Sequence, residues 1–439
     1  MNSILYLPTR YFPSISGAEF YLQRMAEILS FNYLYEIDIF TSNAIDFRAL
    51  RNTEGKTINK NDNYFNFVNN LRINRYPIED KSTLHEKIEK INNIPEFGAL
   101  KLSDNCLTSF LKNGPYLPDL IEDLLKSNNL KYQLIHTTFF PYFNLIISLI
   151  AGNFFNIPTV CTPFFHFSNP RYLDNNLIEV LRKFDLLIAC TPLEKQFLTN
   201  KCKIDDQKIK IIPMGVDIQK FETKNEYRMS SFHFKEKFFK KKEKKYKMVL
   251  FCGYKNYEKG AISLLNSIPL ILNKIKKVYF VFIGPSTLAY NREMSKIQKF
   301  KDVRIINLTP ENLKGYFDDK KLAAFMETDV YCMPSRSDAF GIAFLEAWAA
   351  GKPVIGANIG ATPDVIIDNI DGYLVEFDNI SDIANKVILL LKNKELRKKF
   401  GFTGRIKVSK YYTWELIANK THLTYQELIK NTNESWGQK

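Results

Sequence analysis

The sequence has 439 residues, of which 45% are hydrophobic and 25% are charged. This is ordinary globular usage, which excludes a disordered or fibrous protein, and the length predicts two domains. The formal net charge of +14 comes from lysines spread over the whole chain. We interpret it as compositional bias and do not expect nucleic acid as a partner.

The six cysteines are scattered, without Cys-x-x-Cys spacing and mostly among apolar neighbours. This pattern predicts neither a zinc site nor a disulfide framework, and it favours a reducing cytoplasm. Residues 1–8 lack the basic start and long apolar stretch of a signal peptide, and Ser3–Leu7 is predicted to form a first strand. We therefore expect a cytoplasmic protein.

Short β-rich apolar runs alternate with amphipathic segments through the first half of the chain. Strands are predicted at Ile4–Leu7, Glu36–Thr41, Gln133–Thr137, Thr159–Thr162 and Leu186–Thr191. Helices are predicted between them, notably at Ala18–Leu29 and Asp119–Ser127. Alternation of this kind indicates parallel strands joined by crossover helices.

The stretch between Lys131 and Arg171 carries no formal charge, so a membrane span has to be considered. Prolines and asparagines interrupt its apolar part, and the helical piece, 142–155, is too short for a hydrocarbon core about 30 Å thick. We predict a buried helix between two buried strands. His136 ends the first of these strands; we expect a structural role for it, and a place in a ligand site is the alternative.

The same alternation returns in the second half without sequence repetition. Strands are predicted at Lys247–Cys252, Val278–Gly284, Val303–Leu308, Val330–Met333 and Pro353–Ala357, and helices at Gly260–Asn273 and Ile342–Ala350. A Pro/Gly turn near Pro213–Asp217 marks the join.

We therefore predict an α/β protein with two Rossmann-like, doubly wound domains that face each other across a cleft. The first domain is residues 1–212, the second is residues 213–405, and a helical segment at 406–439 packs back on the first. Ligands of such sheets bind beyond the carboxyl ends of the strands.

The segment Phe234–Lys247 is rich in lysine and holds four aromatic side chains. Such a segment can attract an anionic membrane surface, or it can be a solvated insertion. Attachment to the inner face of a membrane predicts sedimentation with anionic vesicles at low salt and release at high salt, because the attraction is screened.

The most informative stretch is Met333–Val354, in which a predicted strand ends, a loop carries Asp338 and Gly341, and a helix follows. The free amides of residues 340–342 at the helix N-terminus would form a phosphate site. Gly341 lets a diphosphate approach the backbone closely. Glu346 falls in the second turn among apolar neighbours, where a carboxylate needs polar partners such as sugar hydroxyls.

This string resembles the Glu-x7-Glu signature of family 4 of the glycosyltransferases, which has the form Pro-Ser, two residues, Glu, Gly, Phe-Gly, then Leu-Glu-Ala and Gly-x-Pro-Val. Asp338 falls on the first carboxylate, with Asp in place of Glu, and Glu346 falls on the second. The resemblance implies the GT-B fold. It also implies that Asp338 contacts hydroxyls of the transferred sugar and that Glu346 binds the nucleotide ribose.

Two segments of the first half also resemble this family. Pro13–Glu19 is similar to its Gly-Gly-Ala-Glu loop, with Ser16 replacing the first glycine, which implies that Gly17 faces the donor phosphate or the acceptor. Thr162–His166 is similar to the stretch with the family's active-site histidine, which implies that His166 lies near the sugar ring. Taken alone, Gly17 would be a plain turn residue and His166 a structural one.

The segment Phe251–Gly260 resembles the family's first loop of the second domain, where Gly-Arg is followed by Lys-Gly and both cations bind the diphosphate. Gly253 and Lys259 match, and the charge of Lys259 would stabilise the leaving nucleoside diphosphate. Tyr254 replaces the arginine. A different donor contact, a substitute cation from Lys255, or weak activity would each account for that departure.

No convincing Asp-x-Asp motif follows a strand, so we expect no metal and no cofactor beyond the nucleotide-sugar substrate. The predicted function is transfer of a sugar, with retained configuration, from a nucleotide sugar to a hydroxyl of a sugar, glycan or lipid-linked acceptor. The candidate catalytic residues are His166, Asp338 and Lys259, and the candidate donor-binding residues are Gly17, Gly253, Lys259, Asp338, Phe340, Gly341, Ile342 and Glu346. The alternatives are a nucleotide-sugar epimerase of the same fold and a non-catalytic nucleotide-sugar-binding subunit.

Overall fold

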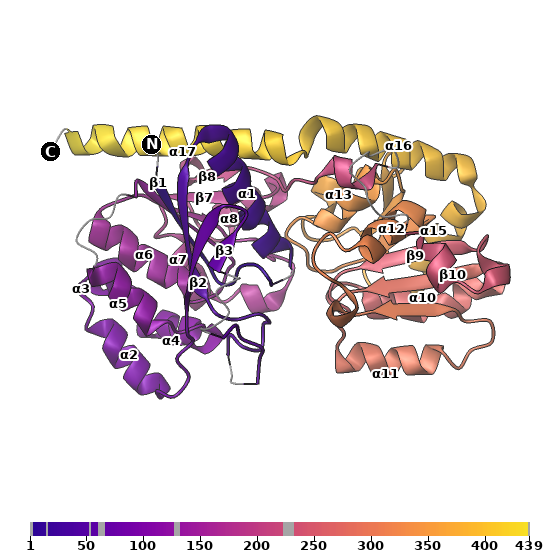
Figure 1. Ribbon diagram of the computed structural model, residues 1–439, viewed down its shortest axis with the longest axis horizontal. Helices are drawn as coiled ribbons and strands as arrows, with labels where there is room; N and C mark the ends of the chain where they lie inside the picture. Colours follow the sequence, from indigo (N-terminus) through magenta and orange to yellow (C-terminus); the bar gives the residue numbers. More distant parts are fainter. Residues whose placement is uncertain are drawn as a thin grey trace. The chain divides into compact units, whose positions relative to one another are not determined.

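The computed structural model describes residues 3–14, 16–51, 54–59, 66–126, 132–222 and 232–437. The chain forms two compact units (Figure 1), Met1–Pro213 with Trp414–Lys439 and Met214–Thr413. The segment that rejoins unit 1 begins at Trp414 rather than at residue 406, because residues 406–411 continue a helix of unit 2. Ile15 and Ser127, which belong to segments discussed above, lie outside the described residues.

Unit 1 contains a sheet of eight strands in the order β3-β4-β2-β1-β5-β6-β7-β8. All neighbouring pairs are parallel except β3 and β4. The carboxyl ends of the parallel strands therefore lie along one edge of the sheet. The strands are β1 (Ser3–Pro8), β2 (Glu36–Ser42), β3 (Phe67–Val68), β4 (Leu71–Tyr76), β5 (Leu134–Thr138), β6 (Thr159–Thr162), β7 (Leu186–Ala189) and β8 (Ile209–Ile211).

Most helices of unit 1 fall into two groups (Figure 1): helix α1 packs with α17, and α2–α7 pack with one another, while α8 packs against β7 and β8. These helices are α1 (Gly17–Tyr33), α2 (Leu84–Asn92), α3 (Pro95–Leu100), α4 (Asp104–Asn113), α5 (Pro118–Lys126), α6 (Asn144–Phe155), α7 (Asn175–Leu181), α8 (Pro192–Asn200) and α17 (Trp414–Gly437). Short 3₁₀ turns include Pro170–Tyr172 and Asp206–Lys208.

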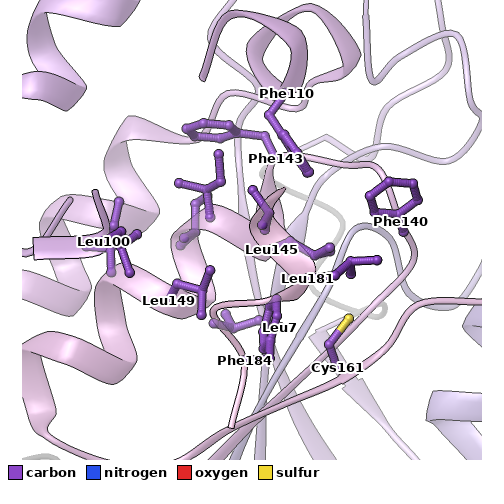
Figure 2. Packing of buried hydrophobic residues seen from close by; sticks show 14 of the residues in the cluster. Leu7, Leu100, Phe110, Phe140, Phe143, Leu145, Leu149, Cys161, Leu181 and Phe184 are labelled. Carbon is purple, nitrogen blue, oxygen red and sulfur yellow. The ribbon is translucent and has the colours of Figure 1, made fainter. Parts of the chain in front are cut away.

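A large core cluster of unit 1 lies between the sheet and the second helix group. Figure 2 shows Leu145 and Leu149 of α6 among aromatic side chains that include Phe110 and Phe143. Helix α6 lies between β5 and β6 in the chain and is buried from Asn144 to Gly152, which confirms a buried helix between two buried strands. Among the described helices, none combines the length and the apolar composition needed to cross a bilayer.

Unit 2 contains a six-stranded sheet in the order β11-β10-β9-β12-β13-β14, and all neighbouring pairs are parallel. Its strands are β9 (Lys247–Cys252), β10 (Val278–Ile283), β11 (Ile305–Leu308), β12 (Val330–Met333), β13 (Val354–Ala357) and β14 (Gly372–Val375). Its helices are α9 (Phe234–Phe238), α10 (Ala261–Lys274), α11 (Leu288–Ile297), α12 (Asp319–Glu327), α13 (Ile342–Ala349), α14 (Thr362–Val365), α15 (Ile380–Lys392) and α16 (Lys394–Tyr411). One mainly parallel and one wholly parallel α/β sheet confirm the predicted fold class.

Candidate functional site

Two loops at the carboxyl ends of neighbouring strands hold most of the predicted donor site. One follows β9 and the other follows β12, and the two strands pair in the sheet. The amide of Arg336 donates to the carbonyl of Glu258 over 2.8 Å. Gly260 has a φ of +73°, and a Cβ at this position would lie 2.2 Å from the carbonyl oxygen of Pro334. A side chain is therefore excluded where the two loops meet.

Lys259 and Asp338 form an ion pair across these two loops. Lys259 Nζ lies 2.9 Å from Asp338 Oδ2 and 3.0 Å from the carbonyl oxygen of Ser337. Their side chains are 22% and 13% exposed, so the charges are partly shielded from water but remain accessible. The structure thus brings together two of the three residues predicted to be catalytic.

Helix α13 begins directly after this pair. Gly341 caps the helix with a φ of +91°, and a Cβ there would lie 2.5 Å from the ring of Phe344. Glycine is required at this turn for both its backbone angle and its size. Ile342 is the first residue of the helix and Phe340 is buried beside the cap. The N-terminal end of α13, with its partial positive charge, therefore lies next to Asp338 in the chain.

Glu346 is buried within α13 and already has a partner. Its Oε1 accepts a hydrogen bond of 2.7 Å from Lys321 Nζ of helix α12, and the two side chains are 3% and 9% exposed. The ammonium group of Lys321 also lies 3.6 Å from the ring centroid of Tyr316. Lys321 therefore supplies a polar partner for Glu346 within the protein, so burial of this carboxylate does not by itself require sugar hydroxyls, and its contact with the ribose stays a prediction.

Gly253 and Lys255, in the loop after β9, both form hydrogen bonds to the ends of neighbouring strands. The amide of Gly253 donates to the carbonyl of Ile283 over 2.9 Å. Lys255 is fully buried, and its ammonium group donates to Asn307 Oδ1 and to the carbonyl of Leu308. Burial lowers the pKa of Lys255 to about 8. Because its ammonium is held at the end of β11, Lys255 does not provide the free substitute cation considered above.

Gly17 and His166 belong to unit 1. Gly17 opens helix α1, and a Cβ on it would meet no atom within 4 Å, so the described residues do not themselves require glycine there. His166 lies in the loop after β6, with its ring centroid 5.1 Å from that of Tyr172. Both residues follow strands at the carboxyl edge of the sheet, as predicted.

Glu194 holds the loop that carries His166, a role that was not predicted from the sequence. Its carboxylate is fully buried and accepts hydrogen bonds from the amides of Phe165 and Cys190, at 2.8 and 2.6 Å. Burial raises the pKa of Glu194 to about 7. The Thr-x-x-Glu spacing from Thr191 is a helix-start signal that could have drawn attention to it.

His136 is structural rather than part of an accessible site. It is fully buried, its Nδ1 hydrogen-bonds with the hydroxyl of Tyr425 in α17, and its Nε2 lies 2.9 Å from Thr162 Oγ1. Burial lowers the pKa of His136 to about 3, from an ordinary value of 6.5. The side chain is therefore neutral in the folded protein at physiological pH.

This burial predicts that acid destabilises the protein through His136. Below pH 6.5 the unfolded chain binds a proton that the folded state takes up only near pH 3, so stability falls across that interval. At pH 5 the loss from this group amounts to about 2 kcal/mol. Denaturant unfolding at several pH values should show a shallower dependence on pH for His136→Gln than for the wild type. His85→Gln, at an exposed position, should keep the wild-type dependence, and an unchanged slope in His136→Gln would contradict the assignment.

The basic segment Phe234–Lys247 directs aromatic side chains inward. Phe234 and Phe239 are buried, and the ring of Phe239 stacks on that of Tyr279 with centroids 3.8 Å apart. Lys235 and Lys247 pair with Asp329. These side chains are therefore not presented to a membrane, and exposed lysines such as Lys240 and Lys241 offer only an electrostatic attraction. Within the described ranges, no group of three His, Cys, Asp or Glu side chains is placed to hold a metal ion.

Two family profiles match successive parts of the chain. "Glycosyltransferase Family 4" matches residues 87–220, and "Glycosyl transferases group 1" matches residues 233–407. The two parallel sheets, their order and the solved structures described below define a GT-B protein. The chain belongs to the group 1 glycosyltransferases of the family 4 type.

Curated relatives are matched over part of their length. An uncharacterized glycosyltransferase of Methanocaldococcus jannaschii is 33% identical over 172 residues, 38% of this chain and 47% of the relative. Phosphatidyl-myo-inositol mannosyltransferase of Mycobacterium leprae is 31% identical over 183 residues, 41% of this chain and 46% of the relative. The chain thus spans about half the length of these relatives.

Solved structures resemble nearly the whole chain. Anabaena HepE in complex with UDP and glucose has a TM-score of 0.70 at 13% identity, covering 97% of this chain and 99% of that one. Sucrose-phosphate synthase of Thermosynechococcus elongatus has a TM-score of 0.68 at 16% identity, covering 98% of this chain and 100% of that one. At these identities the likeness concerns the fold alone.

Proposed function

We propose that this protein transfers a glycosyl unit from a nucleotide sugar to a hydroxyl acceptor with retained anomeric configuration. The observation that carries the proposal is the Lys259–Asp338 pair beside the N-terminus of α13. A cation, a carboxylate and a helix N-terminus together suit a sugar linked to a diphosphate. HepE, which shares the fold, is described in complex with UDP and glucose and with UDP-glucose.

The roles of the residues follow from their charges. Lys259 and the amides of α13 would stabilise the negative charge on the departing diphosphate. Asp338 would accept hydrogen bonds from sugar hydroxyls, and Glu346 would bind the ribose. In the structure, Asp338 is the one carboxylate of the described residues that pairs with Lys259. With the donor bound, the diphosphate and Asp338 would both contact the ammonium group of Lys259. His166 would contact the sugar from unit 1.

The proposed step needs no protein nucleophile. The bond from the anomeric carbon to the diphosphate oxygen breaks, and the acceptor oxygen bonds to that carbon on the same face. The acceptor's proton passes to the leaving phosphate oxygen. We propose that no metal ion or further cofactor takes part, because Lys259 and the helix N-terminus supply the positive charge that a divalent ion supplies elsewhere.

Two measurements test this function in sequence. A thermal-shift screen of UDP, GDP and ADP sugars should identify one donor class. NMR analysis of the product formed with that donor, in the presence of EDTA, should then show the anomeric configuration of the donor. An inverted product or a rate abolished by EDTA would refute the proposal. Isomerised nucleotide sugar without acceptor would indicate an epimerase, and binding without transfer to any acceptor would indicate a non-catalytic subunit.

Attachment of the basic segment to an anionic membrane is also a proposal. The exposed lysines of the segment support it, whereas its buried aromatic side chains limit the interaction to electrostatics. Vesicle sedimentation at low and high salt tests it. Wild-type protein that stays in the supernatant at low salt would leave a solvated insertion as the better interpretation, and a soluble acceptor would then be favoured.

A further inference from the structure

Three arginines and a tyrosine lie in four loops at the carboxyl edge of the unit 1 sheet. Arg10 follows β1, Arg51 lies in the loop after β2, and Arg171 lies in the loop after β6. Tyr142 follows β5. Burial raises the pKa of Tyr142, and the positive charges of Arg51, Arg10 and Arg171 oppose that rise.

Two of these guanidinium groups meet at a single neutral acceptor. Arg51 Nη2 and Arg171 Nη2 donate to the same atom, Asn113 Oδ1, over 3.2 and 3.1 Å. Neither arginine forms an ion pair with a carboxylate of the described residues. Two like charges thus share one amide oxygen, and an anion placed between them would lower the energy of the arrangement.

The acidic groups close to these arginines in the chain have partners of their own. Arg10 pairs with Glu19 at 2.7 Å, and both side chains are buried. Asp46 accepts hydrogen bonds from three backbone amides of its own loop, residues 48, 49 and 56. Asp174 accepts one from the amide of Asn176. None of these carboxylates forms an ion pair with Arg51 or Arg171.

Close backbone packing holds Asn113 beside the loop that carries Arg51. The turn after Asn113 has Gly114 at a φ of +64°, and a Cβ there would lie 2.0 Å from the carbonyl oxygen of Leu50. This close approach fixes Asn113 beside Arg51. The ring of Tyr142 stacks on that of Phe47, which lies in the same loop as Arg51, with centroids 6.3 Å apart. Arg51 and Arg171 are exposed, whereas Leu50 and Tyr142 are buried in a small core cluster.

The position suggests the ligand. Arg171 adjoins Tyr172, whose ring lies against that of His166, the residue expected near the reacting sugar. We propose that Arg51 and Arg171, with Asn113, form a subsite that binds a phosphate group of the acceptor. The planar donors of arginine suit phosphate oxygens, and two of them can hold one phosphate from two sides. The acceptor is then an anionic molecule, either a sugar phosphate or a lipid-linked phosphate.

That the ligand is the acceptor rests on the proposed function, whereas the binding of phosphate does not, so the test uses no donor and no turnover. Inorganic phosphate and glucose 6-phosphate are titrated at low salt while the arginine side-chain NεH signals are followed by NMR. Glucose is the uncharged comparison. We expect the signals of Arg51 and Arg171 to shift with both phosphates and not with glucose. Arg51→Gln and Arg171→Gln should each weaken phosphate binding roughly tenfold, and the double variant more.

The matched control is Arg72→Gln, an exposed arginine of strand β4 in the same unit. It should leave phosphate affinity unchanged. No phosphate-dependent shift, or an equal loss of affinity in Arg72→Gln, would overturn the proposal. A last titration with short-chain phosphatidic acid distinguishes the two sources: tighter binding than glucose 6-phosphate supports a lipid-linked acceptor, and weaker binding supports a soluble one.

Discussion

Replacing Glu346 with glutamine is expected to lower the affinity for the donor nucleotide about tenfold to a hundredfold. A charge-assisted hydrogen bond to a ribose hydroxyl contributes about 1.5–3 kcal/mol, and the neutral amide loses most of it. Glutamine is preferable to alanine because Lys321 Nζ, 2.7 Å from the carboxylate, keeps a hydrogen-bond acceptor. Titration calorimetry with the nucleoside diphosphate measures the effect.

The matched control is a second buried lysine–carboxylate pair of unit 2. Asp371 Oδ2 lies 2.8 Å from Lys407 Nζ, and their side chains are 1% and 14% exposed. Asp371→Asn removes a buried negative charge near α13, as Glu346→Gln does, but it changes no residue of the two donor-site loops. It should lower the melting temperature and leave nucleotide affinity unchanged. Wild-type affinity in Glu346→Gln would remove Glu346 from the site.

Replacing Asp338 with asparagine is expected to reduce turnover on the order of a hundredfold, a loss typical of one preorganised polar contact in a transition state. Affinity for the free nucleoside diphosphate should stay the same or rise slightly. The reason is that Asp338 competes for Lys259, whose ammonium lies 2.9 Å away. Steady-state rates and calorimetry on the same preparation separate the two effects.

Lys259→Gln provides the opposite pattern for comparison. It removes the cation that we assign to the diphosphate, so affinity for the free nucleoside diphosphate should fall. If Asp338→Asn lowers that affinity as much as Lys259→Gln does, Asp338 binds the nucleotide rather than the sugar, and the assignment made here is wrong.

The strands that the sequence predicts best are those buried on both faces. Strands β9, β10 and β12 are almost wholly buried, and a strand covered on both sides appears as an unbroken apolar run. Strand β4, Leu71–Tyr76, mixes buried, half-buried and exposed residues and carries two arginines. Strand β14 is four residues long and begins with glycine. A run of mixed polarity, or a short run that begins with glycine, resembles a loop, and these two strands were not predicted.

The candidate site shows the same limit. Lys259, Asp338 and Gly341 could be placed because a continuous motif specifies the turn that holds them. Lys321 could not, because a lysine on a helix is usually solvated, and only the tertiary fold brings it to Glu346. The contact between Arg51 and Asn113 joins residues more than sixty positions apart. No local sequence pattern predicts such a contact.

The return of the chain to unit 1 at Trp414 has a consequence for biosynthesis. Helix α17 supplies Tyr425, whose hydroxyl lies 3.0 Å from that of Tyr6 in the first strand and also contacts His136. A ribosome completes unit 2 before it reaches this helix. During synthesis, the first part of unit 1 therefore lacks helix α17 while the roughly two hundred residues of unit 2 are made. Unit 2 can complete its own sheet during that interval. Unit 1, whose synthesis starts first, is therefore the unit whose fold is completed last.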